Sequence, residues 1–558
     1  MESHSAATVG DVPALLQRVE EAVQAGLWAV GYLSYEVAPA FDRALPTRAP
    51  SDAPLAAFSF FPSPKPLSVG RIDNRAAKID NLSPGISGDE HASAVAAIRA
   101  AIAAGDTYQV NFTFRFQGSL VGEAEELFWH LGGASRAPYA AFLDLGDAAV
   151  VSLSPELFFD LEGERIVMRP MKGTGRRGRF AEEDETFASE LRASQKERAE
   201  NLMIVDMARN DLGRIARPGS VHVASLHDLE RYPTVWQMTS TVEARTEASL
   251  PAIFAALYPC ASVTGAPKPR AMRFIADLES EPRGIYCGAI GWMAPGAETR
   301  RARFSVAIRT ATIERATGEL TYGVGSGIVW DSVAAAEYDE CLAKARALDV
   351  PGPSLALIET MRWTPAEGVR FLERHLSRLA ASADYFDIAF GEGSVREAIA
   401  STLSELSPVA HRIRLQLESE GSLSLTSRPL LDERRSWRVV LAAEPVSSSS
   451  PFLFHKTARR EVYDRALADA SARGADEAIL WNERGEITEG ARTNLVLKID
   501  GRWLTPAREC GLLAGVLRGY LLERGWVREA VLRKKDLFRA ERVAAVSALR
   551  GGIRVELA

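Results

Sequence analysis

Four glutamates of this sequence come in two pairs with the same spacing. Glu197 and Glu200 are three residues apart, and so are Glu337 and Glu340. Both pairs fall in stretches that we expect to be helices, where residues three apart share one face. If the two faces met, four carboxylates would crowd one pocket and repel one another. A hard cation such as Mg²⁺ would relieve that repulsion, usually through one or two carboxylates, waters and an anionic substrate.

The same glutamates also fit ordinary surface helices. Lys196 lies four residues before Glu200, and Lys344 lies four residues after Glu340. Exposed helices carry such oppositely charged pairs routinely. The apolar stretch "NLMIVDMA" beside Glu200 favours a packed helix over a solvated one. Spacing alone therefore leaves both interpretations open.

One lysine lies in a loop whose composition suits an anion. The stretch "RPMKGTGRR" (169–177) sets Lys172 among glycines, a threonine and arginines. It is not a Walker A loop, in which the lysine follows the glycines and leads into a helix. Lys172 could act as an electrostatic clamp for a carboxylate. It could also be a nucleophile once deprotonated, which burial or cations such as Arg169 and Arg176 would favour.

The second half of the chain carries residues that are uninformative one at a time. Lys456 precedes Arg459 and Arg460, a group that alone would be read as a solvated basic face. Glu489 precedes "GARTNLVL" and alone indicates nothing. Their meaning depends on the order of the surrounding segments.

We expect two domains to position these residues. The stretch "DVPGPS" (349–354) interrupts both helix and strand, so we expect domains at 1–348 and 355–558 joined by this linker. Apolar periodicity predicts helices and strands on both sides of it. The predicted helices are 92–105, 196–214, 332–348 and 375–386; the predicted strands are 106–118 and the pair 302–314 with 320–330; a hairpin is predicted around "AILWNERGEIT".

Composition narrows the class of protein. The chain has 558 residues, a net charge of −7 and 47% hydrophobic residues, which argues for an ordinary globular enzyme and against a nucleic-acid binder. No apolar run approaches the ~18 residues that span a bilayer. The four cysteines form no Cys-x-x-Cys pair, and no leader peptide is recognisable at the start. We therefore expect a cytoplasmic protein with reduced thiols and no membrane partner.

Nine segments follow one another in the first half: "GDTYQVNFTFRF", "SPELFF", "RPMKGT", "KERAENLMIVDMARNDLGR", "SVTGAPKPRAM", "RGIYCGAIGW", "FSVAIRT", "YGVGSGIVWDS" and "EYDECLAKA". In this order they resemble the chorismate-utilising enzymes, such as anthranilate, aminodeoxychorismate, isochorismate and salicylate synthases. The resemblance implies an α+β fold, a chorismate-binding α/β sandwich built from antiparallel sheets.

The resemblance also implies roles for individual residues. Mg²⁺ would lie between Glu200 and Glu340, with Glu197 and Glu337 as catalytic residues lining the site. Chorismate is a dicarboxylate, and the metal would bridge it to the enzyme and help hydroxide to leave the ring. The remaining substrate contacts carried over from the family are Tyr286, Arg309, Gly325, Lys344 and Thr264. Glycines near Gly325 would let backbone N–H groups approach an anion, although a bulged strand would also use them.

Lys172 is the residue that separates members of this family. Anthranilate and isochorismate-type enzymes commonly carry alanine there, whereas aminodeoxychorismate synthases carry the lysine of "PIKGT", here "PMKGT". The lysine would add to C2 of the ring, expel the C4 hydroxyl and prepare C4 for ammonia. Two residues depart from the family, because Asn201 and Gln237 stand where many members have histidine.

Five segments follow one another in the second half: "LIETMRW", "FLERHLSRLAASADYF", "HKTARREVYD", "ILWNERGEITEGARTNLVLKIDGRWLTP" and "GLLAGVLR". Their order gives a resemblance to fold-type IV pyridoxal-phosphate enzymes, which include branched-chain and D-amino acid aminotransferases and aminodeoxychorismate lyase. It implies that Lys456 forms the Schiff base with pyridoxal 5'-phosphate and that Glu489 keeps the pyridine nitrogen protonated. The phosphate contacts implied are Arg378, Gly515, Val516 and Ser547. It also implies a homodimer formed through this half.

Together the two halves predict a bifunctional enzyme. The first would make 4-amino-4-deoxychorismate from chorismate and ammonia, and the second would release pyruvate to leave 4-aminobenzoate for folate synthesis. Lys456, once released, would be the base that shuttles a proton. Neither Cys341 nor Cys510 lies in a glutaminase context, so we expect a separate glutamine amidotransferase or free ammonia. The alternatives are an anthranilate synthase fused to another pyridoxal-phosphate enzyme, and a chorismate-binding scaffold without activity.

Overall fold

The computed structural model describes residues 2–51, 53–66, 77–296, 300–348, 355–430 and 436–558. The predicted linker, 349–354, lies outside these residues. The chain divides into two compact units, one of Met1–Arg176 with Ala188–Gly352, and one of Arg177–Phe187 with Pro353–Ala558. The expected α+β class with antiparallel sheets in the first unit is confirmed. The sequence did not predict that the second unit would include Arg177–Phe187.

The larger sheet of the first unit is antiparallel at each of its described pairings. Its strand order is β1-β3-β2-β14-β15-β8-β9-β12-β10, and β11 pairs with β12. Alternating burial in β3 shows the expected period of two, with one face in the core. Its strands are β1 (Glu2–Ala6), β2 (Trp28–Leu33), β3 (Ala56–Phe61), β8 (Leu157–Glu162), β9 (Arg165–Arg169), β10 (Met171–Arg176), β11 (His222–Arg231), β12 (Val235–Arg245), β14 (Ala289–Ala294) and β15 (Arg301–Val306).

The smaller sheet of the first unit has the order β13-β5-β17-β16-β7-β6, with β4 paired to β5. The predicted strand 302–314 is wrong as a single element. It divides into β15 of the larger sheet and β16 of this one, and Arg309 between them has a left-handed backbone with φ 50°. Only its second part pairs with β17. The strands are β4 (Lys78–Pro84), β5 (Gln109–Val121), β6 (Tyr139–Asp144), β7 (Ala148–Ser154), β13 (Gly265–Ala266), β16 (Thr310–Glu314) and β17 (Glu319–Ile328).

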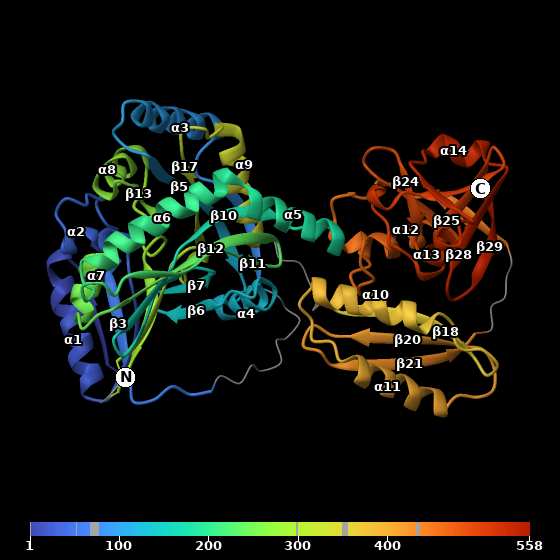
Figure 1. Ribbon diagram of the computed structural model, residues 1–558, viewed down its shortest axis with the longest axis horizontal. Coiled ribbons are helices and arrows are strands. Elements are labelled where there is room, and N and C mark those ends of the chain that lie inside the picture. The colour runs from blue at the N-terminus through green and yellow to red at the C-terminus, as the bar shows by residue number, and fades with distance from the viewer. Residues whose placement is uncertain (1, 52, 67–76, 297–299, 349–354, 431–435) are drawn as a thin grey trace. The chain divides into compact units, whose positions relative to one another are not determined.

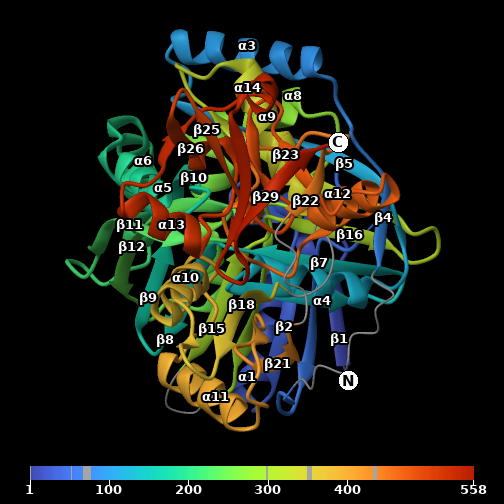
Figure 2. The same ribbon diagram turned by 90° about the vertical axis from the view of Figure 1, so that its right-hand side faces the viewer.

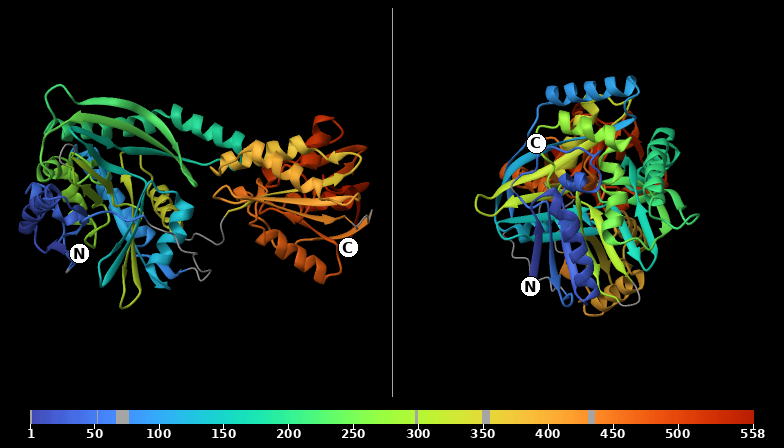
Figure 3. Two further views of the ribbon diagram at one scale, coloured as in Figure 1. Left: turned by 90° about the horizontal axis from the view of Figure 1, so that it is seen from below. Right: turned by 90° about the vertical axis from the view of Figure 1, so that its left-hand side faces the viewer.

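Two helices of the first unit carry the paired glutamates. Helix α6 packs on β10 and β12 of the larger sheet, and α9 packs on β17 of the smaller one (Figure 1). Ser194 caps α6, because its side chain accepts a hydrogen bond from the Glu197 amide. Helix α3 packs against α9 and runs across one end of this unit in the right-hand view of Figure 3. The helices are α1 (Val12–Gln24), α2 (Ala38–Phe41), α3 (Gly88–Ala103), α4 (Ala124–Ser135), α5 (Ala181–Ala193), α6 (Gln195–Gly213), α7 (Leu250–Leu257), α8 (Lys268–Leu278) and α9 (Ala334–Ala345); α5 begins in the part of the chain that belongs to the second unit.

The second unit has two sheets. The smaller has the order β19-β18-β20-β21, and α10 and α11 pack on it through a shared apolar core. The larger has the order β24-β23-β22-β29-β28-β25-β26-β27 and is mixed, since β22 is parallel to both its neighbours (Figure 2). The strands are β18 (Leu357–Thr364), β19 (Gly368–Val369), β20 (His411–Leu417), β21 (Leu423–Pro429), β22 (Ser436–Leu441), β23 (Glu477–Trp481), β24 (Ile487–Gly490), β25 (Asn494–Ile499), β26 (Arg502–Pro506), β27 (Arg528–Ala530), β28 (Arg542–Ser547) and β29 (Gly551–Leu557). The helices are α10 (Leu372–Tyr385), α11 (Glu392–Ser404), α12 (Glu461–Ala472), α13 (Val516–Glu523) and α14 (Lys534–Arg539).

Among the described residues, none of the helices has both the length and the apolar character needed to cross a bilayer.

Candidate functional site

A cavity of about 220 Å³ in the first unit gathers residues from both of its sheets. Its walls include the bulged start of β10, helix α6, the glycine-rich end of β17 and helix α9. The structure brings nine of the predicted site residues to this cavity: Lys172, Glu197, Glu200, Tyr286, Arg309, Gly325, Glu337, Glu340 and Lys344. The two glutamate pairs therefore do face one space, as their spacing on two helices suggested.

Thr264 is not brought to this cavity. Its side chain is fully buried, and its hydroxyl donates to the backbone carbonyls of Cys260 and Ala261 at 3.2 Å each. Its own carbonyl accepts a hydrogen bond from the Asn111 amide. Thr264 thus supports the backbone behind the cavity, because Asn111 lies in the cavity wall.

The nearby lysines offset the effect of burial on the pKa of Glu340 but not on that of Glu200. Burial raises the pKa of Glu200, and Glu197 and Glu337 raise it further against the opposing effect of Lys172. Burial also acts to raise the pKa of Glu340, but the ammonium of Lys344, at 2.7 Å, brings that pKa below its ordinary value. The intrahelical lysine pairs and the shared pocket therefore coexist, so the two interpretations of the spacing are not exclusive.

The glutamates do not form a closed metal cage. In the part of the chain that the structure describes, no group of three or more His, Cys, Asp or Glu side chains is arranged to hold a metal ion. Mg²⁺, however, typically takes only one or two protein carboxylates and fills its other positions with water and substrate oxygens. Glu200 and Glu340 line the same cavity from two helices, and Glu200 is a hard oxygen donor in acidic surroundings. These residues fit Mg²⁺ held jointly with an anionic ligand.

Lys172 lies in a β-bulge. The register of β10 against β12 shifts between Met171 and Thr174, and Gly173 takes a left-handed φ of 98° that suits glycine. Such a bulge turns a side chain out of the normal strand alternation. Here it leaves Lys172 in the cavity wall.

Two buried amides hold this bulge. Asn201 Nδ2 donates to the carbonyl of Lys172 at 3.0 Å, and Gln237 Nε2 donates to the carbonyl of Gly173 at 2.9 Å. The Thr174 hydroxyl in turn donates to Gln237 Oε1 at 3.1 Å. These are the two residues that we expect to stand in place of histidines, and both fix the backbone beside Lys172. Neither amide can titrate, so the bulge is held equally at any pH in the physiological range.

The Lys172 amine lies against the glycines of β17. A Cβ atom built on Gly327 would come within 2.5 Å of Lys172 Nζ, and one on Gly323 would come within 2.3 Å of the Tyr286 ring. Gly323 therefore lets the Tyr286 ring come close, and Gly327 leaves the space that Lys172 Nζ occupies. Lys344 Nζ donates to the carbonyl of Gly325 at 2.8 Å. Among the described residues, Lys172 Nζ makes neither a hydrogen bond nor an ion pair.

Glu156 is a cavity residue that the sequence reasoning missed. It lies in the "SPELFF" stretch, is 3% exposed, and one of its carboxyl oxygens has no hydrogen-bond partner among the described residues. Burial raises its pKa to about 7, although Ser262 and Lys172 oppose the rise. A carboxyl group with that pKa can keep a proton near neutral pH and give it up to a neighbour. A lone glutamate between two strands carries no spacing signal, so only the resemblance of its stretch could have pointed to it.

The second unit has a cavity of about 260 Å³. All six residues predicted to bind the cofactor line it: Arg378, Lys456, Glu489, Gly515, Val516 and Ser547. They come from helix α10, the loop before α12, strand β24, the start of α13 and the end of β28. Residues that were uninformative one at a time therefore share one space.

Burial shifts the pKa values of Lys456 and Glu489. Burial, with Arg378 and Arg460 nearby, lowers the pKa of Lys456 from 10.5 to about 8. Burial raises the pKa of Glu489 to about 7, although the Leu513 amide and the Tyr463 hydroxyl stabilise its charged form. The Tyr463 hydroxyl donates to Glu489 Oε1 at 2.9 Å, and the Leu513 amide donates to the same oxygen at 3.1 Å. Glu489 is thereby fixed in one orientation.

Arg378 is held by a buried carboxylate that the sequence reasoning did not assign. Its Nε and Nη2 atoms donate to the two oxygens of Glu359 at 2.9 and 2.7 Å. Although burial alone would raise it, the charges of Arg378 and His375 lower the pKa of Glu359 to about 2. Such a two-point contact fixes the plane of the guanidinium. Glu359 therefore orients Arg378 toward the cavity.

The cavity fits pyridoxal 5'-phosphate. Gly515 is the N-cap of α13, whose first turn offers unpaired backbone N–H groups to a phosphate beside Arg378. A side chain at Gly515 could not be accommodated, because its Cβ would come within 1.9 Å of Asn494 Oδ1. Lys456, whose amine can lose its proton, is then available for the carbonyl of the cofactor. The buried carboxyl of Glu489 is available for the ring nitrogen.

Comparison with known proteins matches one family to each half of the chain. Residues 70–349 match the family of chorismate binding enzymes, which is half of the chain, and residues 356–557 match amino-transferase class IV. The chain belongs to the chorismate binding enzyme family and carries an amino-transferase class IV domain after it.

Relatives that match the first half of the chain carry two different enzyme names. The chain is 44% identical over 253 residues to aminodeoxychorismate synthase component 1 of Salmonella typhimurium, which covers 45% of this chain and 55% of the relative. It is 41% identical over 257 residues to anthranilate synthase component 1 of Streptomyces coelicolor, covering 46% and 49%. The structure of anthranilate synthase component I from Streptococcus pneumoniae superposes with a TM-score of 0.53 and 25% identity over 60% of this chain and 85% of that one. The chain thus spans about half the length of the curated relatives it matches.

The acidity of Lys456 leads to a prediction about the uptake of the cofactor. A lysine attacks an aldehyde only as the neutral amine, which forms as the pH rises through the pKa, here about 8 instead of 10.5. We therefore expect the rate at which apo-protein takes up pyridoxal phosphate covalently to rise up to about pH 8 and then level off. Trapping with borohydride at timed points measures that rate. A rate still rising steeply at pH 9.5, as for a small-molecule amine measured alongside, would contradict the lowered pKa.

Proposed function

We propose that the first unit makes 4-amino-4-deoxychorismate from chorismate and ammonia, and that the second unit releases pyruvate from it to give 4-aminobenzoate. The observation that supports this most is Lys172, which lies in a cavity with two pairs of glutamates. The carboxylates suit a metal and a dicarboxylate substrate. The lysine is the residue by which aminodeoxychorismate synthases differ from their anthranilate-forming relatives.

In the first cavity the chain's own residues would bind and activate chorismate. Arg309, Lys344 and the Tyr286 hydroxyl would hold its carboxylates, and Glu200 with Glu340 would hold Mg²⁺, which when bound supplies positive charge. Lys172 would attack C2 while the C4 hydroxyl leaves. Glu156, whose pKa is about 7, would give that hydroxyl its proton. Ammonia would then add at C4, and Lys172 would leave C2 as the amine.

In the second cavity Lys456 would hold and then release the cofactor, and would move a proton as a base. Pyridoxal phosphate, when bound, supplies an electron sink. Glu489 would keep a proton at the ring nitrogen, and Arg378 with the start of α13 would anchor the phosphate. The product of the first reaction has the amine that such chemistry requires, which links the two units.

The ammonia would come from a glutamine amidotransferase on another chain. Both relatives named above are called component 1, which is consistent with a second component. Among the described residues the cysteines Cys260, Cys287, Cys341 and Cys510 are all buried, and burial raises the pKa of each. None has the reactive thiolate of a glutaminase.

A second candidate for the first unit is anthranilate synthesis. It is favoured by the names of the Streptomyces and Streptococcus relatives. Both reactions use chorismate, ammonia and Mg²⁺, and they differ in the ring position that receives nitrogen. Incubating the protein with chorismate, Mg²⁺ and ammonium, and separating 2-aminobenzoate from 4-aminobenzoate by chromatography, decides between them.

The glutamates lead to a prediction about the metal. We expect Glu200→Gln and Glu340→Gln each to lower chorismate turnover by more than about a hundredfold, because loss of a ligand should exceed the ~10–100-fold cost of losing an outer-shell partner. Asp206→Asn, on the same helix but with a side chain that is 61% exposed, is the matched control and should be unaffected. Full turnover in excess EDTA would refute the metal.

The role of Lys172 can be separated from its charge. We expect both Lys172→Ala and Lys172→Arg to lose formation of 4-amino-4-deoxychorismate, because arginine keeps the charge but cannot be deprotonated to attack a ring carbon. Product analysis with ammonium as the nitrogen donor gives the result, including any shift toward 2-amination. Substantial 4-amination by the arginine variant would reduce Lys172 to an electrostatic contact.

Lys456 should be needed only for the second reaction. We expect Lys456→Ala to lose the visible absorbance of bound cofactor and to stop at 4-amino-4-deoxychorismate, with the first rate kept within about twofold because the sites are distinct. Lys498→Ala, which removes a lysine paired with Glu541 at 2.8 Å, is the control. Release of pyruvate at the normal rate by Lys456→Ala would show that the lyase assignment is wrong.

A further inference from the structure

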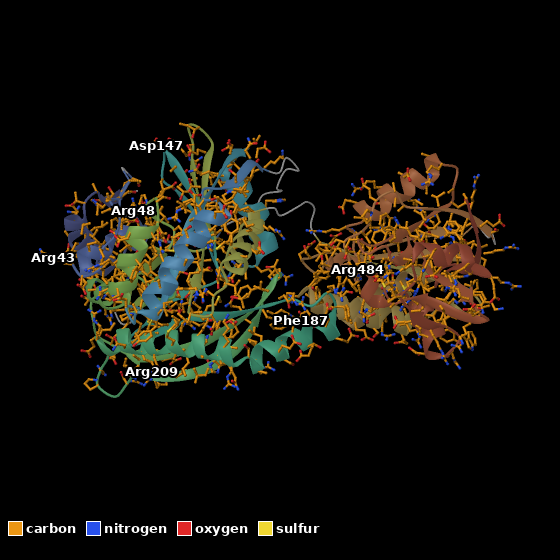
Figure 4. All side chains as sticks on the ribbon, turned by 90° about the horizontal axis from the view of Figure 1, so that it is seen from above. Arg43, Arg48, Asp147, Phe187, Arg209 and Arg484 are labelled. Atoms are coloured by element: carbon orange, nitrogen blue, oxygen red, sulfur yellow. The ribbon has the colours of Figure 1, made fainter. Side chains whose placement is uncertain are left out.

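The second unit contains a segment of the chain that its own family match does not include. Arg177–Phe187 belongs to this unit, whereas the amino-transferase class IV match begins at residue 356. We call it the inserted segment. It follows directly on β10, the strand of Lys172, and it forms the first turns of α5. Figure 4 labels Phe187 at the end of this segment and Arg484 in the rest of the unit.

Arg177 starts the segment with a buried ion pair. Its side chain and that of Asp184 are each 5% exposed, and Arg177 Nε donates to Asp184 Oδ1 at 2.8 Å. The guanidinium also lies over the Tyr385 ring at 4.5 Å and donates to the Tyr385 carbonyl at 3.1 Å. The Tyr385 hydroxyl donates back to the Gly178 carbonyl at 2.6 Å. A buried charge bound by this many partners makes the contact specific rather than adventitious.

Arg179 and Phe180 continue the contact. Arg179 Nη1 donates to the carbonyls of Ser448 and Glu509 at 3.1 and 3.2 Å, and its guanidinium lies 4.8 Å from the Phe454 ring centre. The Phe180 ring packs on the same Phe454 ring at 5.2 Å. The segment therefore covers the residue that precedes His455.

His455 is the point at which the inserted segment reaches the cofactor site. Its Nε2 lies 3.2 Å from the Arg179 carbonyl, and its Nδ1 lies 2.9 Å from the Ser382 hydroxyl. A carbonyl only accepts, so Nε2 carries the proton and Nδ1 accepts from Ser382. Burial lowers the pKa of His455 to about 4, so the ring stays neutral and keeps this arrangement at physiological pH. His455 lines the second cavity and is the neighbour of Lys456.

We propose that the inserted segment positions Lys456 by holding His455, so that the cofactor site of the second unit is complete only with residues from the chorismate-binding part of the sequence. Arg179 and His455 are then positioning residues for Lys456. The inference rests on the proposed attachment of pyridoxal phosphate to Lys456 and is independent of which reaction follows. It means that residues 355–558 are not a self-sufficient enzyme domain.

The test uses the full-length protein and the variant Arg179→Ala. We expect the dissociation constant of pyridoxal phosphate to rise about tenfold, because a guanidinium that donates to two carbonyls is lost. Hydrogen exchange in the apo-protein should speed up in the peptide that contains His455 and Lys456. Chorismate turnover by the first unit should be unchanged and shows that the chain is folded. Glu185→Ala, which changes an exposed residue of the same segment, is the matched control.

A double variant distinguishes positioning through His455 from general loosening. If the segment acts through this ring, His455→Ala and Arg179→Ala should not add, so the double variant should bind the cofactor about as weakly as His455→Ala alone. Arg179→Lys, which keeps the charge but not the two-carbonyl reach, should fall between wild type and Arg179→Ala. Unchanged affinity and exchange in Arg179→Ala, or fully additive losses, would overturn the proposal. Absence of lyase activity in the wild type would contradict only the proposed function, since neither readout depends on it.

Discussion

The rest of this structure depends on two cavities in which charged side chains are buried close together. In the first unit, the charge of Lys172 lowers the pKa values of Glu156, Glu200 and Glu340, and burial acts to raise each of them. Bringing them together requires both sheets and two helices to meet at one place. An enzyme that must hold a dicarboxylate beside carboxylates has a use for this arrangement, because a cation and a lysine can then serve enzyme and substrate at once.

The backbone around Lys172 shows how the fold keeps that charge in place. A bulge turns the lysine out of the strand, glycine at Gly327 leaves room for its amine, and the amides of Asn201 and Gln237 fix the bulge from behind. Histidines at those two positions could gain a proton and a charge near the lysine, whereas amides cannot. The two amides thus hold the bulge in position without titrating.

The spacing of apolar residues predicted helices and strands, and the order of the matching segments along the chain predicted the site residues. Helices α6 and α9 lie within two or three residues of the expected ranges, and the structure brings nine predicted residues to the first cavity and six to the second. The sequence could not predict contacts made by single residues that belong to no spacing pattern. Glu359 orients Arg378 from another element, Glu156 is an unspaced glutamate, and the hydroxyl of Thr264 is used by the backbone. The break in 302–314 coincides with a change in the phase of the apolar alternation, since Val306 and Ile308 lie at even positions and Ala311 and Ile313 lie at odd ones. Arg309 between them has the left-handed backbone at which the chain changes sheet.

The inserted segment shows that the predicted linker does not by itself divide the residues between the two cores. Pro and Gly residues locate a linker in the sequence, but a linker marks only where the chain leaves one core, and not which residues each core contains. Here a buried arginine–aspartate pair, a cation over an aromatic ring and a histidine hydrogen bond place Arg177–Phe187 in the second core. These groups are charged or polar and are nearly all satisfied within the second unit, so separating them would leave buried charge unpaired. Fusion of the two halves in one chain is therefore consistent with a physical need of the second unit, whichever reactions the two units carry out.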